Sequence, residues 1–430
     1  MYVILRTWWP LALSWLLMGC ERPVVSAVIA RLPDPAIHLA AYGGVVFPLS
    51  LVIESPVIML LAASTALAKS WAWYRFLRAI TLWLGFGLTS LHGLVAFTSL
   101  FDVVVRDLLG IPPALVEPAR VGMQLMTPWT AAIAFRRFQQ GVLIRDGHTH
   151  LISWGTVVRL MVLSGFLVGG AMLTSLSGIA VGTLAISLGV ISEALFINRV
   201  VQPTLKRLRA TVSRSPSLPS LAWFAKFYMP LATTPLLTLL ALPLASAALS
   251  RMPNAVESLA VWPVVGGLVF LFQSLGLAYQ EVVVALLDKP GTRVLLYRFT
   301  QYLALGVSIP LGIFAITPLA RLWFVDVSGL LSPLAHFAES VLWMAVAIPA
   351  LAVIESWFQG ILVYHQQTHG IIEAVGIYLV ASGFLLGLGI LYDQIPGLYV
   401  GYGATLMGLL MQILWLWRRS RILSPLPNEA

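Results

Sequence analysis

Charged residues are scarce in this chain of 430 residues. Lysine, arginine, aspartate and glutamate make up 10% of the sequence, whereas 59% of the residues are hydrophobic. A soluble domain carries roughly 25% charged residues, and no soluble fold has a core large enough to bury so much apolar surface. The composition therefore excludes a soluble enzyme and a soluble nucleic-acid-binding protein.

Cysteine is nearly absent, and Cys20 alone cannot form an internal disulfide, which excludes a disulfide scaffold. Histidines lie in the turns after two predicted helices, as His148 with His150 and His365 with His369, but no cysteine or carboxylate clusters with them. We therefore expect no metal site. The nucleotide-binding pattern GxxxxGK followed by Ser or Thr does not occur, so no cofactor is expected and transport would draw on a gradient.

Long apolar segments are what the sequence does contain. About a dozen of them have roughly 20 residues or more, enough to cross the hydrocarbon layer of about 30 Å as a helix. We therefore predict an all-α, multi-pass membrane protein. Its twelve transmembrane helices are expected at about residues 7–30, 38–68, 76–101, 114–142, 150–174, 178–202, 222–249, 257–287, 294–320, 335–363, 370–391 and 397–417.

The basic residues orient this topology. When each lysine and arginine is assigned to the nearer membrane face, twenty lie on the face that carries both termini and six on the other. Basic residues concentrate in cytoplasmic loops, so both termini are predicted to be cytoplasmic. The formal net charge of +9 is then explained by topology, and no nucleic-acid partner is expected.

The second half of the sequence matches the first when the two are aligned. The clearest match aligns SGFLVG at 164–169 with SGFLLG at 382–387, and prolines and glycines elsewhere match in nearly the same register. We predict two homologous six-helix lobes, residues 1–208 and 221–430, joined by a cytoplasmic linker at 209–220. Parallel repeats of this kind are typical of transporters that hold cargo near the middle of the membrane.

A Gln-Gly pair ends the fourth helix of each predicted lobe, as Gln140-Gly141 and Gln359-Gly360, and a Thr-His turn precedes each fifth helix. With two parallel six-helix lobes, these features make the chain resemble the MATE-like (MOP) superfamily of multidrug exporters, polysaccharide-lipid flippases and lipid II flippases. The resemblance extends over almost the whole chain. It implies a MATE-like fold and an alternating-access transport mechanism.

Two further segments resemble one branch of that superfamily. LAAYG at 39–43 and IESPVIMLL at 53–61 are similar to the progressive ankylosis (ANKH) family and its bacterial relatives. This resemblance implies a bacterial-type inner (plasma) membrane location and small organic anions as exported cargo. No aspartate in the first helix matches the ion site of the sodium- and proton-coupled multidrug exporters, so coupling through that site is not implied.

Ionisable side chains at membrane depth are costly unless paired or hydrated, so each is a candidate cargo- or ion-binding residue. Glu54 is the candidate for reversible protonation, because its sequence neighbours are apolar and desolvation favours the neutral form of a carboxyl group. The alternatives are structural: Arg22 extends to the membrane surface and Glu21 pairs with it, and Glu54 makes local hydrogen bonds. Glu193 and Glu281 would pair with the basic cytoplasmic ends of helices. The candidates are Glu21, Arg22, Glu54, Arg136, Arg137, Glu193, Glu281 and Glu355.

Arg136, Arg137 and Glu355 occupy corresponding places in the two lobes, about one helical turn before the Gln-Gly pairs. One hypothesis is that an arginine of this pair closes a cytoplasmic gate with Glu355, and another is that the arginines hold an anionic cargo. The alternative is that the arginines extend to the cytoplasmic interface and Glu355 is solvated there.

The sequence thus favours an exporter of a small organic or amphipathic anion in the lipid bilayer, with a proton or sodium as coupling ion. A flippase for a lipid-linked oligosaccharide or a phospholipid is the alternative, and it would need a lateral opening wide enough for a lipid tail. A membrane-bound acyl or glycosyl transferase would need clustered His, Asp or Glu at one membrane face. The carboxylates here are scattered, so we expect no enzymatic activity.

The topology can be tested with accessibility tags at residue 1, near Ser215 and at residue 430. All three tags should be inaccessible from outside intact cells, because twenty of the basic residues lie on the same membrane face as the two termini and the linker, and that face is predicted to be cytoplasmic. Labelling of any one of them by an impermeant reagent would contradict the twelve-helix topology.

Overall fold

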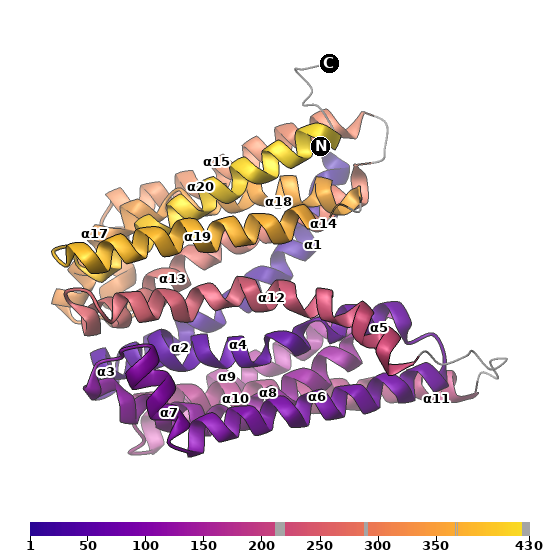
Figure 1. Ribbon diagram of the computed structural model, residues 1–430, viewed down its shortest axis with the longest axis horizontal. Helices are drawn as coiled ribbons and strands as arrows, with labels where there is room; N and C mark the ends of the chain where they lie inside the picture. Colours follow the sequence, from indigo (N-terminus) through magenta and orange to yellow (C-terminus); the bar gives the residue numbers. More distant parts are fainter. Residues whose placement is uncertain (211–219, 288–290, 366, 368, 424–430) are drawn as a thin grey trace. The chain divides into compact units, whose positions relative to one another are not determined.

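The computed structural model describes residues 1–210, 220–287, 291–365, 367 and 369–423 (Figure 1). Every regular element in these residues is helical. Eleven of the helical segments are long and apolar enough to cross a membrane. Helices satisfy their own backbone hydrogen bonds, which is what the hydrocarbon layer requires. The chain is therefore an all-α, multi-pass membrane protein.

The helices form two compact units. The central unit comprises Leu32–Pro243, and the terminal unit comprises Met1–Arg31 with Leu244–Ala430. The central unit holds α3 (Pro35–Ala40), η1 (Ala41–Val46), α4 (Phe47–Ile58), α5 (Leu60–Leu67), α6 (Trp71–Phe97), α7 (Leu100–Asp102), η2 (Val103–Leu108), α8 (Pro113–Arg145), α9 (His150–Leu173), α10 (Gly178–Val200), α11 (Gln202–Ala210) and most of α12 (Leu221–Leu249).

The terminal unit contains the first two helices of the chain and the elements that follow α12. Its members are α1 (Tyr2–Gly19), α2 (Glu21–Ile29), α13 (Ala255–Leu277), α14 (Tyr279–Leu286), α15 (Thr292–Ile316), α16 (Leu319–Arg321), η3 (Leu322–Val327), α17 (Ser332–Ala345), α18 (Ile348–Tyr364), α19 (His369–Tyr392) and α20 (Gly397–Leu423).

Helix α8 explains why eleven apolar segments were found where twelve spans were predicted. It has 33 residues and matches the segment predicted at 114–142, but it is not among the helices that are apolar enough. Helices α4, α5, α6 and α10 pack around α8, and many of its polar side chains are buried. Because protein covers this helix, its polar residues need not face lipid, and its hydropathy is correspondingly low.

Helices α1 and α12, which begin the two predicted lobes, pack outside their own lobes. Trp8 on α1 donates its indole N–H to the Leu275 carbonyl of α13 at 2.9 Å. Tyr228 on α12 donates to the Pro56 carbonyl of α4. The compact units therefore differ from the lobes predicted at 1–208 and 221–430, which describe a repeat in the sequence and stay a prediction. Most of the predicted linker, residues 211–219, lies outside the described residues.

Unusual backbone geometry recurs at positions that the predicted repeat aligns. Asp34 and Asn254, which precede α3 and α13, have left-handed φ angles of 52° and 55°. Aspartate and asparagine tolerate this conformation better than most side chains. Gly110 and Gly329 have φ angles of 67° and 74°, and the aligned elements η2 and η3 are both π-helices. The chain makes the same local turns at these matched positions.

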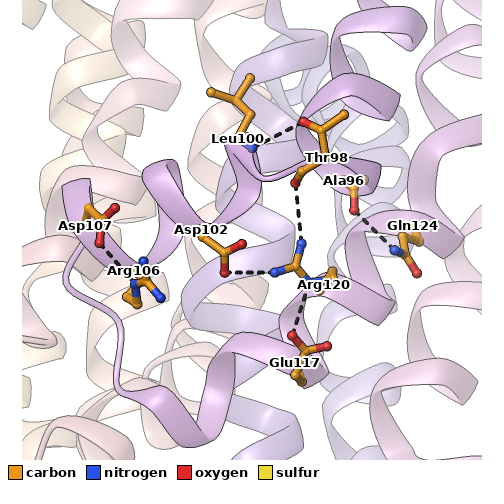
Figure 2. Close-up of polar contacts among 9 residues, drawn as sticks. All are labelled: Ala96, Thr98, Leu100, Asp102, Arg106, Asp107, Glu117, Arg120 and Gln124. Carbon is orange, nitrogen blue, oxygen red and sulfur yellow. Dashed lines mark hydrogen bonds and ion pairs between the residues drawn. The ribbon is translucent and has the colours of Figure 1, made fainter.

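Arg120 ties the start of α8 to the turn after α6 (Figure 2). Its guanidinium donates to Asp102 Oδ1 at 2.8 Å, to Glu117 Oε1 at 3.2 Å and to the Thr98 carbonyl at 3.5 Å. One turn farther along α8, Gln124 donates to the Ala96 carbonyl at 3.2 Å. These contacts fix the end of α6 and the short α7 against α8.

Asp102→Asn should lower the free energy of unfolding by about 1–2 kcal/mol, because a carboxylate that accepts a charged hydrogen bond from Arg120 becomes a neutral amide. The measurement is thermal unfolding of the purified protein in detergent. Asp107→Asn is the matched control. Asp107 forms an ion pair with Arg106 in which the Arg106 side chain is 60% exposed and the Asp107 side chain 55%, and such a surface pair should contribute about 0–1 kcal/mol. Equal losses in the two variants would contradict the assigned role of Asp102.

Candidate functional site

A charged cluster is buried among α8, α9 and α10 of the central unit. Arg136 donates to Glu193 Oε2 at 2.6 Å, and Gln140 donates to Glu193 Oε1 at 3.0 Å. Arg159 Nη1 lies 3.7 Å from the same Oε2. The side chains of Arg136 and Glu193 are only 5% and 1% exposed. We call Arg136, Gln140, Arg159 and Glu193 the Glu193 cluster.

Glycines allow α9 and α10 to approach each other beside this cluster. A Cβ atom on Gly189 of α10 would lie 3.2 Å from the Arg159 carbonyl oxygen, and one on Gly155 of α9 would lie 3.3 Å from Glu193 Cγ. Contacts this short leave little room for any larger residue. The two glycines therefore help bring the Arg159 guanidinium within reach of Glu193.

Arg137 follows Arg136 on α8 but has a different environment. Its side chain is partly exposed, and among the described residues it makes no hydrogen bond or ion pair. It interacts electrostatically with Glu193 and with Glu54, which is 3% exposed on α4, and is repelled by Arg136 and Arg159. Among these five groups, three are guanidinium groups and two are carboxylates.

Glu355 is the corresponding charged residue on α18 of the terminal unit. Gln359 on the same helix donates to Glu355 Oε1 at 2.6 Å, and Gln412 on α20 donates to the same oxygen at 2.7 Å. Tyr378 on α19 interacts with Glu355 electrostatically. The carboxylate is held by amides rather than by a guanidinium.

The remaining predicted residues lie elsewhere in the terminal unit. Glu21 is buried at the start of α2, and the Arg22 guanidinium lies 5.5 Å from the centre of the Phe270 ring. Arg22 also interacts electrostatically with the buried Tyr402. Glu281 on α14 is exposed.

Four of the predicted residues lie together in the central unit, namely Glu54, Arg136, Arg137 and Glu193. Arg136 donates to Glu193, whereas the amides of two glutamines donate to Glu355. The gate that would pair an arginine with Glu355 therefore stays a prediction.

Sequence reasoning missed the roles of three residues, Arg159, Tyr378 and Gln412. The predicted repeat could have found them, because the alignment that pairs the two Gln-Gly endings also pairs Arg159 with Tyr378 and Glu193 with Gln412. A charged residue in one lobe thus points to the matching position in the other lobe, even where that position carries no charge.

Histidine and carboxylate side chains form no evident metal site. Within residues 1–210, 220–287, 291–365, 367 and 369–423, no three His, Cys, Asp or Glu side chains lie close enough to hold a metal ion. His148 lies 3.2 Å from Asp146 Oδ2 in the turn after α8. The same carboxylate oxygen accepts hydrogen bonds from Thr204 and Arg207, so it is held by a salt-bridge network.

Solved structures with this fold are membrane transporters and a flippase. An inward-facing multidrug resistance MATE family transporter of the MOP superfamily aligns with a TM-score of 0.72 and 14% identity, covering 96% of this chain and 98% of its own. The lipid II flippase MurJ in an inward closed conformation aligns with a TM-score of 0.70 and 14% identity, covering 95% and 88%. A MOP superfamily transporter from Pyrococcus furiosus aligns with a TM-score of 0.63 and 17% identity, covering 97% and 95%.

No family model matches the sequence, and no curated protein sequence does. The structural matches nevertheless extend over almost the whole chain at TM-scores of 0.63 to 0.72. The protein therefore has the fold of the MATE transporters and of MurJ.

Glu193→Gln should lower the free energy of unfolding by about 3–5 kcal/mol, because it leaves the Arg136 guanidinium buried beside a neutral amide. Thermal unfolding followed by tryptophan fluorescence measures the loss. The double variant Glu193→Gln with Arg136→Gln should recover part of the lost free energy of unfolding, since the two residues interact directly. Glu117→Gln, which alters a carboxylate with a side chain 76% exposed, is the control and should change stability by less than about 1 kcal/mol. A Glu193→Gln variant as stable as the unmodified protein would contradict the role of this pair.

Proposed function

We propose that this protein is an alternating-access transporter that exports a small organic or amphipathic anion. The observation that carries the proposal is the MATE fold over 96% of the chain, together with a surplus guanidinium inside one of its two units. A single positive charge within apolar helices attracts an anion and disfavours a cation.

Arg137 is the proposed anion-binding group. Arg136 is already bound to Glu193, whereas Arg137 makes no ion pair with a described residue and its side chain is partly exposed. A planar guanidinium binds carboxylate or phosphate through two parallel hydrogen bonds, which gives both affinity and orientation. The Glu193 cluster would hold α8 in place behind this group.

The finer features of the topology belong to the same proposal. Helix α8 serves as the twelfth span, both termini are cytoplasmic, and the two six-helix lobes are homologous. The similarity of 39–43 and 53–61 to the ankylosis branch supports an organic anion as cargo and a bacterial-type inner membrane as location. The chain needs no catalytic group for this activity, and a proton or sodium gradient would drive it.

A lipid flippase is the second candidate, and a groove on the terminal unit favours it. The groove has a volume of about 900 Å³ and lies along α19 and α20, where Val380, Phe384, Met407 and Met411 line it. Such an apolar groove fits an acyl chain, and MurJ is a flippase with this fold. In this case Arg137 would bind the anionic headgroup of a lipid-linked cargo.

Untargeted metabolite analysis of cells with and without the protein tests the proposal. Export should raise one or more organic anions in the medium, and Arg137→Gln should reduce that export about tenfold or more, because a charged hydrogen bond contributes about 1.5–3 kcal/mol. Arg137→Lys should recover only part, since an ammonium cannot bind bidentately.

Arg145→Gln is the matched control on the same helix, because within the described part of the chain the Arg145 guanidinium donates to the Thr65 and Ala66 carbonyls. This variant should export normally. Unchanged export by Arg137→Gln would remove Arg137 from the proposed site. An effect confined to membrane lipids, with no change in the medium, would select the flippase.

A further inference from the structure

Glu355 and its partners occupy the positions that the predicted repeat aligns with the Glu193 cluster. We call Glu355, Gln359, Tyr378 and Gln412 the Glu355 cluster. In the register of 219 residues that pairs the two Gln-Gly endings, the corresponding residues are Arg136 and Glu355, Gln140 and Gln359, Arg159 and Tyr378, and Glu193 and Gln412. The packing agrees with this register, because a Cβ atom on Gly189 would lie 3.2 Å from the Arg159 carbonyl oxygen and one on Gly408 would lie 3.2 Å from that of Tyr378.

The two clusters share one pattern of contacts. In the central unit, position 136 on α8 bonds to position 193 on α10 at 2.6 Å. In the terminal unit, position 355 on α18 bonds to position 412 on α20 at 2.7 Å. In each unit, the glutamine one turn farther along the helix, Gln140 or Gln359, donates to the carboxylate of the cluster.

The charges of the two clusters differ, although the contacts match. Glu193 lies beside two guanidinium groups, those of Arg136 and Arg159. Among the described residues, the partners of Glu355 are neutral, because the corresponding helices supply Gln412 and Tyr378 instead of charged side chains. Glu355 therefore has no fixed counter-charge in its cluster.

No other helix around α18 supplies that charge. Helices α13, α14, α15, α19 and α20 pack against α18. Among the described residues, α20 presents Gln412 and α19 presents Tyr378 to Glu355, and no charged group of α13, α14 or α15 interacts with it electrostatically. Glu373 on α19 is bound to Arg419, and Glu281 on α14 is exposed. A carboxylate so placed needs a mobile cation or a proton to be neutral.

The arrangement of the amides favours a proton over a metal cation. Both glutamines direct their Nε2 donors at Glu355 Oε1, which leaves Oε2 to carry hydrogen. A hard metal cation requires several oxygen ligands around it. Donor nitrogens would repel it.

We propose that Glu355 is the carboxyl group that binds and releases the proton coupled to transport. The inference rests on the proposed transport function and gives its coupling ion. Proton binding at Oε2 removes the negative charge from the Glu355 cluster. The change between a charged and a neutral Glu355 cluster would bias the unit between two conformations.

Infrared difference spectroscopy of the full-length protein in lipid vesicles tests the proposal without any cargo. As the pH falls from about 9 to about 6, a range above that in which exposed carboxyl groups protonate, Glu355 should add the carbonyl stretch of one neutral carboxylic acid. Glu355→Gln should abolish this band. Gln412→Arg should abolish it too, because the new guanidinium recreates the ion pair of the Glu193 cluster with the helices exchanged and keeps Glu355 ionised.

Glu373→Gln is the matched control, since Glu373 is a carboxylate of the same unit that already has Arg419 as its partner. This variant should keep the band. A band that survives in both Glu355→Gln and Gln412→Arg would overturn the proposal, as would a spectral change that depends on sodium at constant pH. If Glu355→Gln does not fold, the presence or absence of the band in Gln412→Arg tests the proposal.

The two proposals fail in different ways. Loss of the proton assignment would leave anion export by the unmodified protein and its dependence on Arg137 untouched. Conversely, a normal infrared titration with no exported anion would overturn the transport proposal alone.

Discussion

Hydrocarbon offers a charged side chain neither water nor counter-ions, and this constraint governs where both units place their charges. The central unit meets it with opposite charges, since Glu193 lies between Arg136 and Arg159. The terminal unit meets it with the amides of Gln359 and Gln412. Ion pairs fix a protonation state, whereas amides accept either state of a carboxyl group. The first arrangement suits a rigid support, and the second suits a group that changes its charge.

The matched clusters indicate that the two units share an arrangement of helices but differ in the charges that those helices carry. At the other end of the helices, Arg120 binds Asp102 in the central unit, and the residues aligned with them are Glu339 and Arg321, with the signs exchanged. Those two residues line a pocket of about 480 Å³ in the terminal unit. The backbone turns are alike in both units, but the signs of the charges at aligned positions differ.

Much of the fold could be predicted from the sequence, because the length of an apolar segment is a local property. The π-helices and the packing of α1 and α12 could not, since they depend on neighbours distant in the chain. Arg136 and Glu193 were each recognised as costly charges, but their pairing depends on how α8 and α10 are rotated about their axes. Gln412 and Tyr378 were missed because the candidates were chosen as ionisable residues in apolar segments, and these two side chains are uncharged.

The packing of α1 has a consequence for biosynthesis. Helix α1 is synthesised well before its partner α13, which begins only at Ala255. At a synthesis rate of about 5–20 residues per second, α1 waits for roughly 10–50 s before that partner exists. During this time α2, which follows α1, carries Glu21 and Arg22 without the residues of α13 that Arg22 contacts in the complete unit, such as Phe270. Water or lipid headgroups must therefore accommodate both charges until α13 is made.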